Sequence, residues 1–195
     1  CPDSHTCTQG AMGALAWGIG STEAEHALAT RTLRINRPKT MRITVNGVLG
    51  TGVTAKDLAL TLLARHGSRG GQGHIVEFAG TAIEALEIEA RLTLCNMGAE
   101  LGCFSTIIAP DEKTFAYLEG RPYAPKGELW DQAVAYWRTL KTDDGASFDK
   151  EIVLDASEVG PMITWGTSPQ QAISIDAVVP HADEASAEIH QRAVT

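Results

Sequence analysis

Segments with helical spacing of apolar residues alternate along this chain with short segments of strand character, and this alternation constrains the fold most strongly. The helical patterns are clearest over residues 54–67, 84–102 and 129–140. The strand patterns are short and apolar, and they cover residues 41–45, 74–78, 107–108 and 152–155. Alternation of this kind is typical of layered α/β domains. The sequence therefore predicts an α/β fold in αβα layers, with helices packed on a mixed sheet.

Polar residues at the starts of helical patterns predict where three helices begin. Thr22, with Glu25 three residues later, matches a capping box and predicts a helix that begins there and ends near Pro38. Thr54 and Asp111 precede later apolar periodic segments and are the expected N-caps of two further helices.

Glycine patterns predict turns. The segment 9–20 carries four glycines and is expected to form a closely packed helix or a backbone-rich turn. Asn46-Gly47 follows the strand pattern at 41–45 and predicts a hairpin turn. Gly70–Gly73 lacks both the Lys-Ser/Thr of a phosphate loop and the spacing of a dinucleotide fold, so a tight turn is expected there. The alternative is an anion-binding site formed by the backbone amides of this turn.

The chain begins at Cys1 without Met, and its most motif-like polar segment lies within the first eight residues. We therefore expect it to be part of a longer protein. Residues 1–180 are expected to form one α/β region, and 181–195, rich in Ala, Glu and His, a surface tail or a truncated helix.

Charge and composition exclude several classes of partner. Lys and Arg number 16 against 24 Asp and Glu, so the formal charge is −8, and the cations are scattered. Neither a nucleic-acid interface nor contact with an anionic membrane is expected. No apolar run approaches the roughly 20 residues of a membrane span, and no signal peptide is visible. The four cysteines are too few and too irregularly spaced for the disulfide framework of a small secreted protein. The sequence therefore predicts a protein of the reducing cytoplasm.

The segment Asp3-Ser4-His5-Thr6 concentrates a carboxylate, two hydroxyls and an imidazole before a glycine-rich stretch. Such a loop can relay protons or bind an anion. The alternative is a helix-capping sequence, because Asp, Ser and Thr commonly begin helices. A hydrolase triad is excluded, since adjacent residues of an extended loop point in different directions.

Asn96 and Glu100 are four residues apart in the predicted helix 84–102 and would share one face. A buried carboxylate there has a raised pKa and can act as an acid or base. The alternative is a solvated glutamate or a surface ion pair. The cysteines, Cys95 and Cys103 among them, are interpreted as structural.

These segments together resemble the aconitase family in order and spacing, and the resemblance covers nearly the whole chain, weakening after residue 180. It rests on the segments 3–6, 10–20, 70–78, 93–100 and 109–112. Three others, at 130–137, 142–146 and 164–169, are most similar to the large subunits of 3-isopropylmalate dehydratase.

The resemblance implies an aconitase-like domain and a set of site residues. Asp3 and His5 correspond to the active-site loop, Ser4 to a hydroxyl that contacts substrate, Asn96 to a residue beside the cluster, and Glu100 to a carboxylate near iron-bound water. His5 and Glu100 would form the catalytic proton network, in which Asp3 is hypothesised to orient His5. The implied reaction is the dehydration and rehydration of a small 2-hydroxy dicarboxylic acid in leucine biosynthesis, with iron as the Lewis acid.

The chain also departs from the family pattern. The family's cluster ligands follow a Cys…Cys-x-x-Cys pattern, which is absent from this sequence, and the four cysteines present are not their counterparts. The resemblance therefore implies a [4Fe–4S] cluster only in a full-length protein, and no metal ligand within this chain. Pro2 stands where the family commonly has Gly.

Further parts of the active site are expected on other segments and on a partner. An upstream histidine, the arginines that grip substrate carboxylates and a small-subunit (swivel-domain) partner are all implied from outside this chain. The isolated fragment is expected to be inactive. Two alternatives stay open: a related hydro-lyase acting on homoaconitate, methylmalate or dimethylmalate, or a cluster-free dicarboxylate-binding module.

Overall fold

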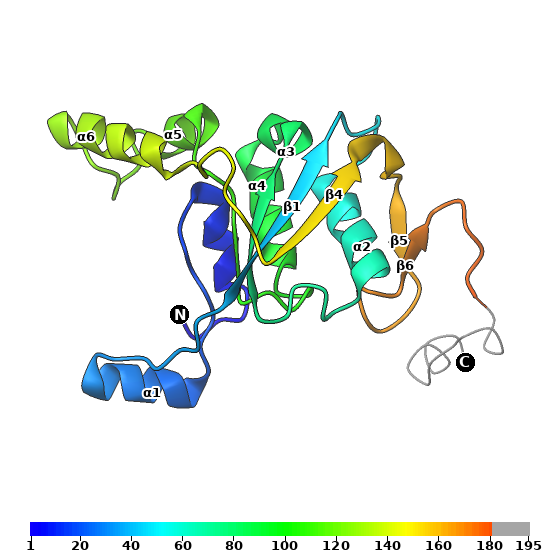
Figure 1. The fold of residues 1–195 in the computed structure, drawn as a ribbon, viewed down its shortest axis with the longest axis horizontal. Helices are drawn as coiled ribbons and strands as arrows, with labels where there is room; N and C mark the ends of the chain where they lie inside the picture. Colours follow the sequence, from blue (N-terminus) through cyan, green and yellow to red (C-terminus); the bar gives the residue numbers. More distant parts are fainter. Residues whose placement is uncertain (181–195) are drawn as a thin grey trace.

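The computed structural model of this chain describes residues 1–180, and Figure 1 shows a parallel sheet with helices packed against it. The tail or truncated helix expected at 181–195 lies outside the described residues. The α-helices are α1 (Ser21–Thr30), α2 (Ala55–His66), α3 (Thr81–Ala85), α4 (Ile88–Met97), α5 (Glu112–Leu118) and α6 (Glu128–Trp137). The 3-10 helices are η1 (Thr6–Met12), η2 (Arg138–Leu140) and η3 (Ala156–Glu158).

The main sheet has four strands in the order β3-β2-β1-β4. Their bounds are β1 (Lys39–Asn46), β2 (His74–Ala79), β3 (Ser105–Ile107) and β4 (Lys150–Asp155). All three pairings are parallel, and Ile43 of β1 aligns with Phe78 of β2 and Ile152 of β4. The α/β fold class is confirmed. A single mixed sheet was expected, but parallel and antiparallel pairs lie in separate sheets. The antiparallel pair is formed by β5 (Met162–Thr164) and β6 (Ala172–Ser174).

The hairpin predicted at Asn46-Gly47 is wrong. β1 has parallel neighbours on both sides, and parallel strands are joined by a crossover rather than a two-residue turn. Gly47 does turn the chain, with φ 93°, but the segment that follows leads into α2. The Asn-Gly pair therefore predicted the change of direction correctly and the partner strand incorrectly.

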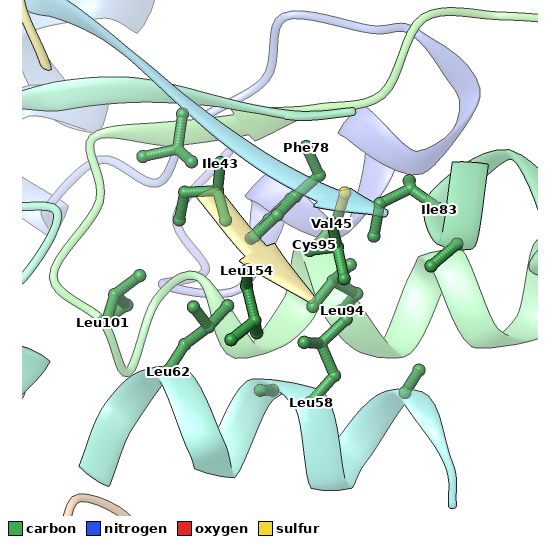
Figure 2. Close-up of a cluster of buried hydrophobic side chains, with 14 of the residues drawn as sticks. Ile43, Val45, Leu58, Leu62, Phe78, Ile83, Leu94, Cys95, Leu101 and Leu154 are labelled. Carbon is green, nitrogen blue, oxygen red and sulfur yellow. The ribbon is translucent and has the colours of Figure 1, made fainter. Parts of the chain in front are cut away.

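The core lies between one face of the sheet and the helices α2 and α4 (Figure 2). Ile43 and Val45 of β1 project toward Leu58 and Leu62 of α2, and Leu94 of α4 completes the contact. These side chains are at most 2% exposed. The alternation along β1, buried at every second residue from Met41, follows from the two-residue period of a strand.

Helix α1 begins and ends earlier than predicted. It starts at Ser21, and the Glu23 carboxylate, rather than Glu25, accepts a hydrogen bond from the Gly20 amide, at 2.8 Å. The helix ends at Thr30 because Arg31 adopts a left-handed conformation with φ 58°. No residue of α1 is buried, and the helix projects from the sheet (Figure 1).

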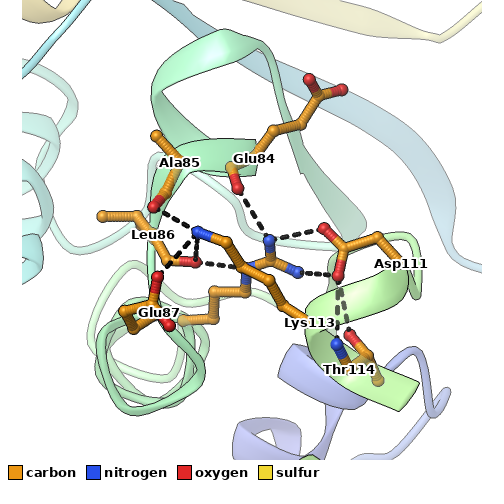
Figure 3. Close-up of polar contacts among 8 residues, drawn as sticks. Glu84, Ala85, Leu86, Glu87, Asp111, Lys113 and Thr114 are labelled. Carbon is orange, nitrogen blue, oxygen red and sulfur yellow. Dashed lines mark hydrogen bonds and ion pairs between the residues drawn. The ribbon is translucent and has the colours of Figure 1, made fainter. Parts of the chain in front are cut away.

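The single helix predicted over 84–102 is divided. α3 ends at Ala85, Leu86 is extended with ψ 141°, and α4 begins at Ile88 and ends at Met97. Arg91 stabilises this break, since its guanidinium donates to the backbone carbonyls of Glu84 and Leu86 (Figure 3). The side chain of Arg91 is completely buried.

The other predicted helix starts are confirmed. Thr54 caps α2 and Asp111 caps α5, each accepting a hydrogen bond from the amide three residues later. Helix α6 also forms as the periodicity predicts, but it has no buried residue and extends away from the sheet (Figure 1). Within residues 1–180, no helix is long and apolar enough to cross a membrane.

Candidate functional site

The loop 3–6 enters a 3-10 helix, and this fixes its polar side chains. Thr6 donates from both its amide and its hydroxyl to the Asp3 carbonyl, at 3.2 and 2.7 Å. Thr8 donates from its amide and hydroxyl to the His5 carbonyl, at 3.0 and 2.6 Å. These repeated i to i+3 bonds hold η1 tightly wound. The segment expected to be either a packed helix or a turn is therefore a 3-10 helix up to Met12.

The His5 imidazole lies between a hydroxyl and a carboxylate. Its Nδ1 is 3.0 Å from Ser4 Oγ, and its Nε2 is 3.4 Å from Glu100 Oε1. The His5 and Glu100 side chains are 38% and 39% exposed, so the contact is open to solvent. At 3.4 Å the contact between His5 Nε2 and Glu100 Oε1 is an ion-pair distance and is long for a hydrogen bond.

Donor and acceptor chemistry assigns the tautomer of neutral His5. An ionised carboxylate only accepts, so the proton of neutral His5 is placed on Nε2, the ring nitrogen that lies beside Glu100. Nδ1 is then an acceptor, and the Ser4 hydroxyl donates to it. Ser4, His5 and Glu100 thus form a line of neighbouring groups through which one proton can pass between the Ser4 hydroxyl and the Glu100 carboxylate.

Glu100 lies just beyond α4 rather than within it. α4 ends at Met97, and residues 98–102 continue as a series of turns in which the Glu100 amide donates to the Met97 carbonyl. The prediction that Asn96 and Glu100 share one face of a continuous helix is therefore wrong in its geometry. Asn96 nevertheless reaches η1, since its Nδ2 donates to Thr8 Oγ1 at 2.9 Å, and Glu100 reaches His5, the N-cap of η1.

Asp3 contacts the backbone of His5, not its ring. Asp3 Oδ1 accepts a hydrogen bond of 2.7 Å from the His5 amide, as a turn-forming aspartate does. The hypothesis that Asp3 orients His5 therefore holds only through the main chain. Its expected catalytic role stays a prediction, as do those of His5 and Glu100 and the substrate contact of Ser4.

Two open clefts flank the candidate site. One, of about 610 Å³, is lined by Glu100 and Met97 on one side and by the first turn of α2 and residues 162–169 on the other. The second is lined by Asp3 and Ser4 and by the facing residues Gly18 and Phe104. The line of polar groups thus borders two open spaces, of about 610 and 680 Å³, each large enough for a small organic acid.

Gly70–Gly73 forms a turn whose amides bond within the protein. The Gly71 amide donates to the Leu101 carbonyl at 2.9 Å, and the Gly70 amide donates to the Gly67 carbonyl at 3.1 Å. This turn joins α2 to the segment that carries Glu100, so the structure favours the tight turn over the anion site.

The cysteines do not make a site for an iron–sulfur cluster. Cys7 and Cys95 are buried, and the Cys7 thiol donates to the Cys95 carbonyl at 3.3 Å. Burial raises the pKa of the Cys95 and Cys103 thiols to about 12 and raises that of Cys7 as well, whereas cluster ligation requires thiolates. Among residues 1–180, no three His, Cys, Asp or Glu side chains are placed to hold a metal ion. The described residues therefore do not fit a [4Fe–4S] cluster.

Thr8 is a site residue that lies outside the motif at 3–6, although its position in the sequence carries a signal. Thr8 accepts from Asn96 and donates to the His5 carbonyl, so it joins the two segments of the site. A hydroxyl three residues after His5, at the start of a helix, is the spacing of a side-chain bond to the backbone. Thr106, which contacts both segments, has no such signal because it lies on a strand.

This geometry can be set beside the family to which the sequence is similar. The model of the aconitase family (aconitate hydratase) matches residues 1–195, the full length of the chain.

Proposed function

The chain belongs to the aconitase family, a family of hydro-lyases, and from this we propose that the full-length protein interconverts 2-isopropylmalate and 3-isopropylmalate in leucine biosynthesis. The observation that carries the proposal is the meeting of Ser4 and His5 with Glu100, from segments far apart in the sequence. Segments 130–137 and 164–169, which resemble isopropylmalate dehydratase large subunits, support this substrate over citrate.

The reaction removes a hydroxyl from one carbon and a proton from its neighbour, then adds water back with the two positions exchanged. The carbon-bound proton is proposed to pass to a base on the small-subunit partner, which returns it to the other carbon when water adds. The leaving hydroxyl needs a proton to depart as water, and the same proton returns to the protein when water adds. We assign this proton to the His5–Glu100 pair. Ser4 donates a hydrogen bond to His5 in the resting state and is free to turn toward a substrate carboxylate, because a hydroxyl rotates.

A [4Fe–4S] cluster belongs to this proposal only as a part of the full-length protein. Its cysteine ligands would come from outside residues 1–195, since the described cysteines do not fit it. A small-subunit (swivel-domain) protein is proposed to complete the site. The full-length protein is proposed to lie in the cytoplasm.

A second candidate is a cluster-free dicarboxylate-binding module. The open cleft of about 610 Å³ beside Glu100, which is large enough for a small organic acid, is the observation that favours it. The related substrates homoaconitate, methylmalate and dimethylmalate remain alternatives within the hydro-lyase class.

The test is a substrate panel with the full-length protein, purified without oxygen together with its small-subunit partner. Turnover is followed by the ultraviolet absorbance of the alkene, which rises with 3-isopropylmalate, citrate and methylmalate and falls with homoaconitate, because homoaconitate is itself the alkene. We expect the highest kcat/KM with 3-isopropylmalate. Faster turnover of another acid overturns the substrate assignment. If calorimetry shows that the protein binds dicarboxylates in the absence of iron, and none of the acids is turned over, the binding module is supported instead.

A further inference from the structure

The contact between His5 and Glu100 depends on how η1 is fixed against the end of α4. The His5 and Glu100 side chains are both more than one-third exposed, so few neighbours hold the side chains themselves. The distance between them is therefore set by the contacts that fix the two backbone segments against each other. The hydrogen bond from the half-buried Asn96 to Thr8 is one link between the two segments, and the bond from the buried Cys7 thiol to the Cys95 carbonyl is another. A third link comes from neither segment.

Thr106 of β3 lies between η1 and α4. It has no exposed surface, and its Oγ1 is 3.0 Å from the Cys95 carbonyl and 3.3 Å from the Cys7 carbonyl. A hydroxyl has one proton, so it donates to the nearer carbonyl and shares that proton with the other in a three-centre bond. One buried hydroxyl therefore joins the residue two positions after His5 to the residue five positions before Glu100.

Two glycines bring the chain close to Thr106 from opposite sides. A Cβ on Gly10 would lie 1.8 Å from the Thr106 carbonyl oxygen, and a Cβ on Gly98 would lie 2.2 Å from Thr106 Cγ2. Neither glycine tolerates a side chain without movement of the backbone. The Ile108 amide, two residues further along, donates to the Gly10 carbonyl at 3.0 Å and extends the contact.

We propose that Thr106 is a positioning residue for the His5–Glu100 pair, and that its hydroxyl sets the distance between the two side chains. The inference rests on the proposed proton transfer by this pair. Thr106 contacts neither His5 nor Glu100 and acts only through the main chain of η1 and α4.

Kinetics of the full-length enzyme test the proposal with matched variants. Thr106→Val keeps the shape and removes the hydroxyl, whereas Thr106→Ser keeps the hydroxyl. Because a displacement of about 1 Å in a reacting geometry costs up to about 100-fold, we expect Thr106→Val to lower kcat by at least about 10-fold. KM should change much less, and Thr106→Ser should stay close to wild type. If the valine variant does not fold, Thr106→Ala compared with Thr106→Ser isolates the same hydroxyl.

Thr114→Val is the control for a purely structural effect. Thr114 is also completely buried, and its hydroxyl contacts Asp111, in a different part of the molecule. We expect it to lower the melting temperature without lowering kcat. If Thr106→Val loses stability and leaves kcat unchanged, as this control does, the positioning role is overturned.

An NMR measurement separates this inference from the proposed function. The ring resonances of His5, assigned by their loss in His5→Gln, should move in Thr106→Val and not in Thr114→Val. If they move while the wild-type enzyme turns over none of the acids tested, the positioning holds and the proposed function fails. If they do not move in Thr106→Val, the positioning role is wrong whatever the activity.

Discussion

Arg91 and Asp111 are joined by two hydrogen bonds, Nη1 to Oδ1 at 2.9 Å and Nη2 to Oδ2 at 2.6 Å (Figure 3). Asp111 is also the N-cap of α5, since it accepts from the Thr114 amide. Arg91 belongs to α4 and donates to two carbonyls at the end of α3. One buried guanidinium thus holds three helices, and its planar fork satisfies the backbone groups that the break at Leu86 leaves open.

Replacing Arg91 with methionine should destabilise the fold by about 3 kcal/mol. Loss of one partner of a buried pair costs about 3–5 kcal/mol, and the lower end applies because the Asp111 side chain is 36% exposed and can be hydrated. Urea unfolding followed by circular dichroism measures the difference. Arg65→Met is the matched control: its pair with Glu158 is exposed on both sides, so a loss below about 1 kcal/mol is expected. Equal losses in the two variants would contradict the structural role of Arg91.

The same pair predicts a loss of stability in acid. Burial raises the pKa of Asp111, but the hydrogen bonds and charge of Arg91 and the bonds from Thr114 outweigh burial, and the pKa is lowered overall. The unfolded state, with a pKa of about 3.9, therefore binds the proton first as the pH falls. The stabilisation is complete above that value and is lost as the pH falls through the lower folded pKa.

Asp111→Asn isolates this contribution. Asp57 also has a lowered pKa, so the wild type and the variant will both lose stability in acid. The difference between their free energies of unfolding should be largest near neutral pH and should shrink below about pH 4. A difference that stays constant between pH 7 and pH 3 would show that the Asp111 charge does not contribute.

Three of the four cysteines should resist alkylation in the folded protein. A thiol with a pKa of about 12, as burial gives Cys95 and Cys103, has about a thousandfold less thiolate at pH 8 than one at the ordinary value of 9.0. Cys7 is buried as well, whereas Cys1 is exposed. Iodoacetamide labelling read by mass spectrometry should modify Cys1 first, and the others only after denaturation. Rapid native labelling of Cys95 would overturn this assignment.

The parts of the fold that sequence predicted are those set by local chemistry. Thr54 and Asp111 cap their helices as expected, because an N-cap needs only a side chain and an amide three residues away. The errors come from tertiary contacts. The break at Leu86 depends on Arg91 and its distant partner Asp111, and no helical periodicity reports such a contact.

The candidate site shows the same division. The resemblance to a family selected Ser4, His5, Asn96 and Glu100, and the structure brings all four to the junction of η1 and α4. Spacing alone placed Glu100 on a continuous helix, which is wrong because the helix ends at Met97. Thr106 could not be predicted from the sequence, because its hydroxyl contacts backbone carbonyls, and every residue type has a backbone carbonyl.

Glu100→Gln tests the proton pair directly. The amide keeps the size of the side chain and removes the negative charge that faces His5 Nε2 at 3.4 Å. Because a positioned acid or base contributes about 100- to 10,000-fold, we expect kcat of the full-length enzyme to fall by at least about 100-fold, with little change in stability. Ser4→Ala should have a smaller effect, since His5 keeps its contact with Glu100. Glu89→Gln is the control, because Glu89 is an exposed carboxylate in the first turn of α4. If Glu100→Gln and Glu89→Gln retain equal activity, Glu100 holds no catalytic proton, and the line from Ser4 through His5 ends at the imidazole.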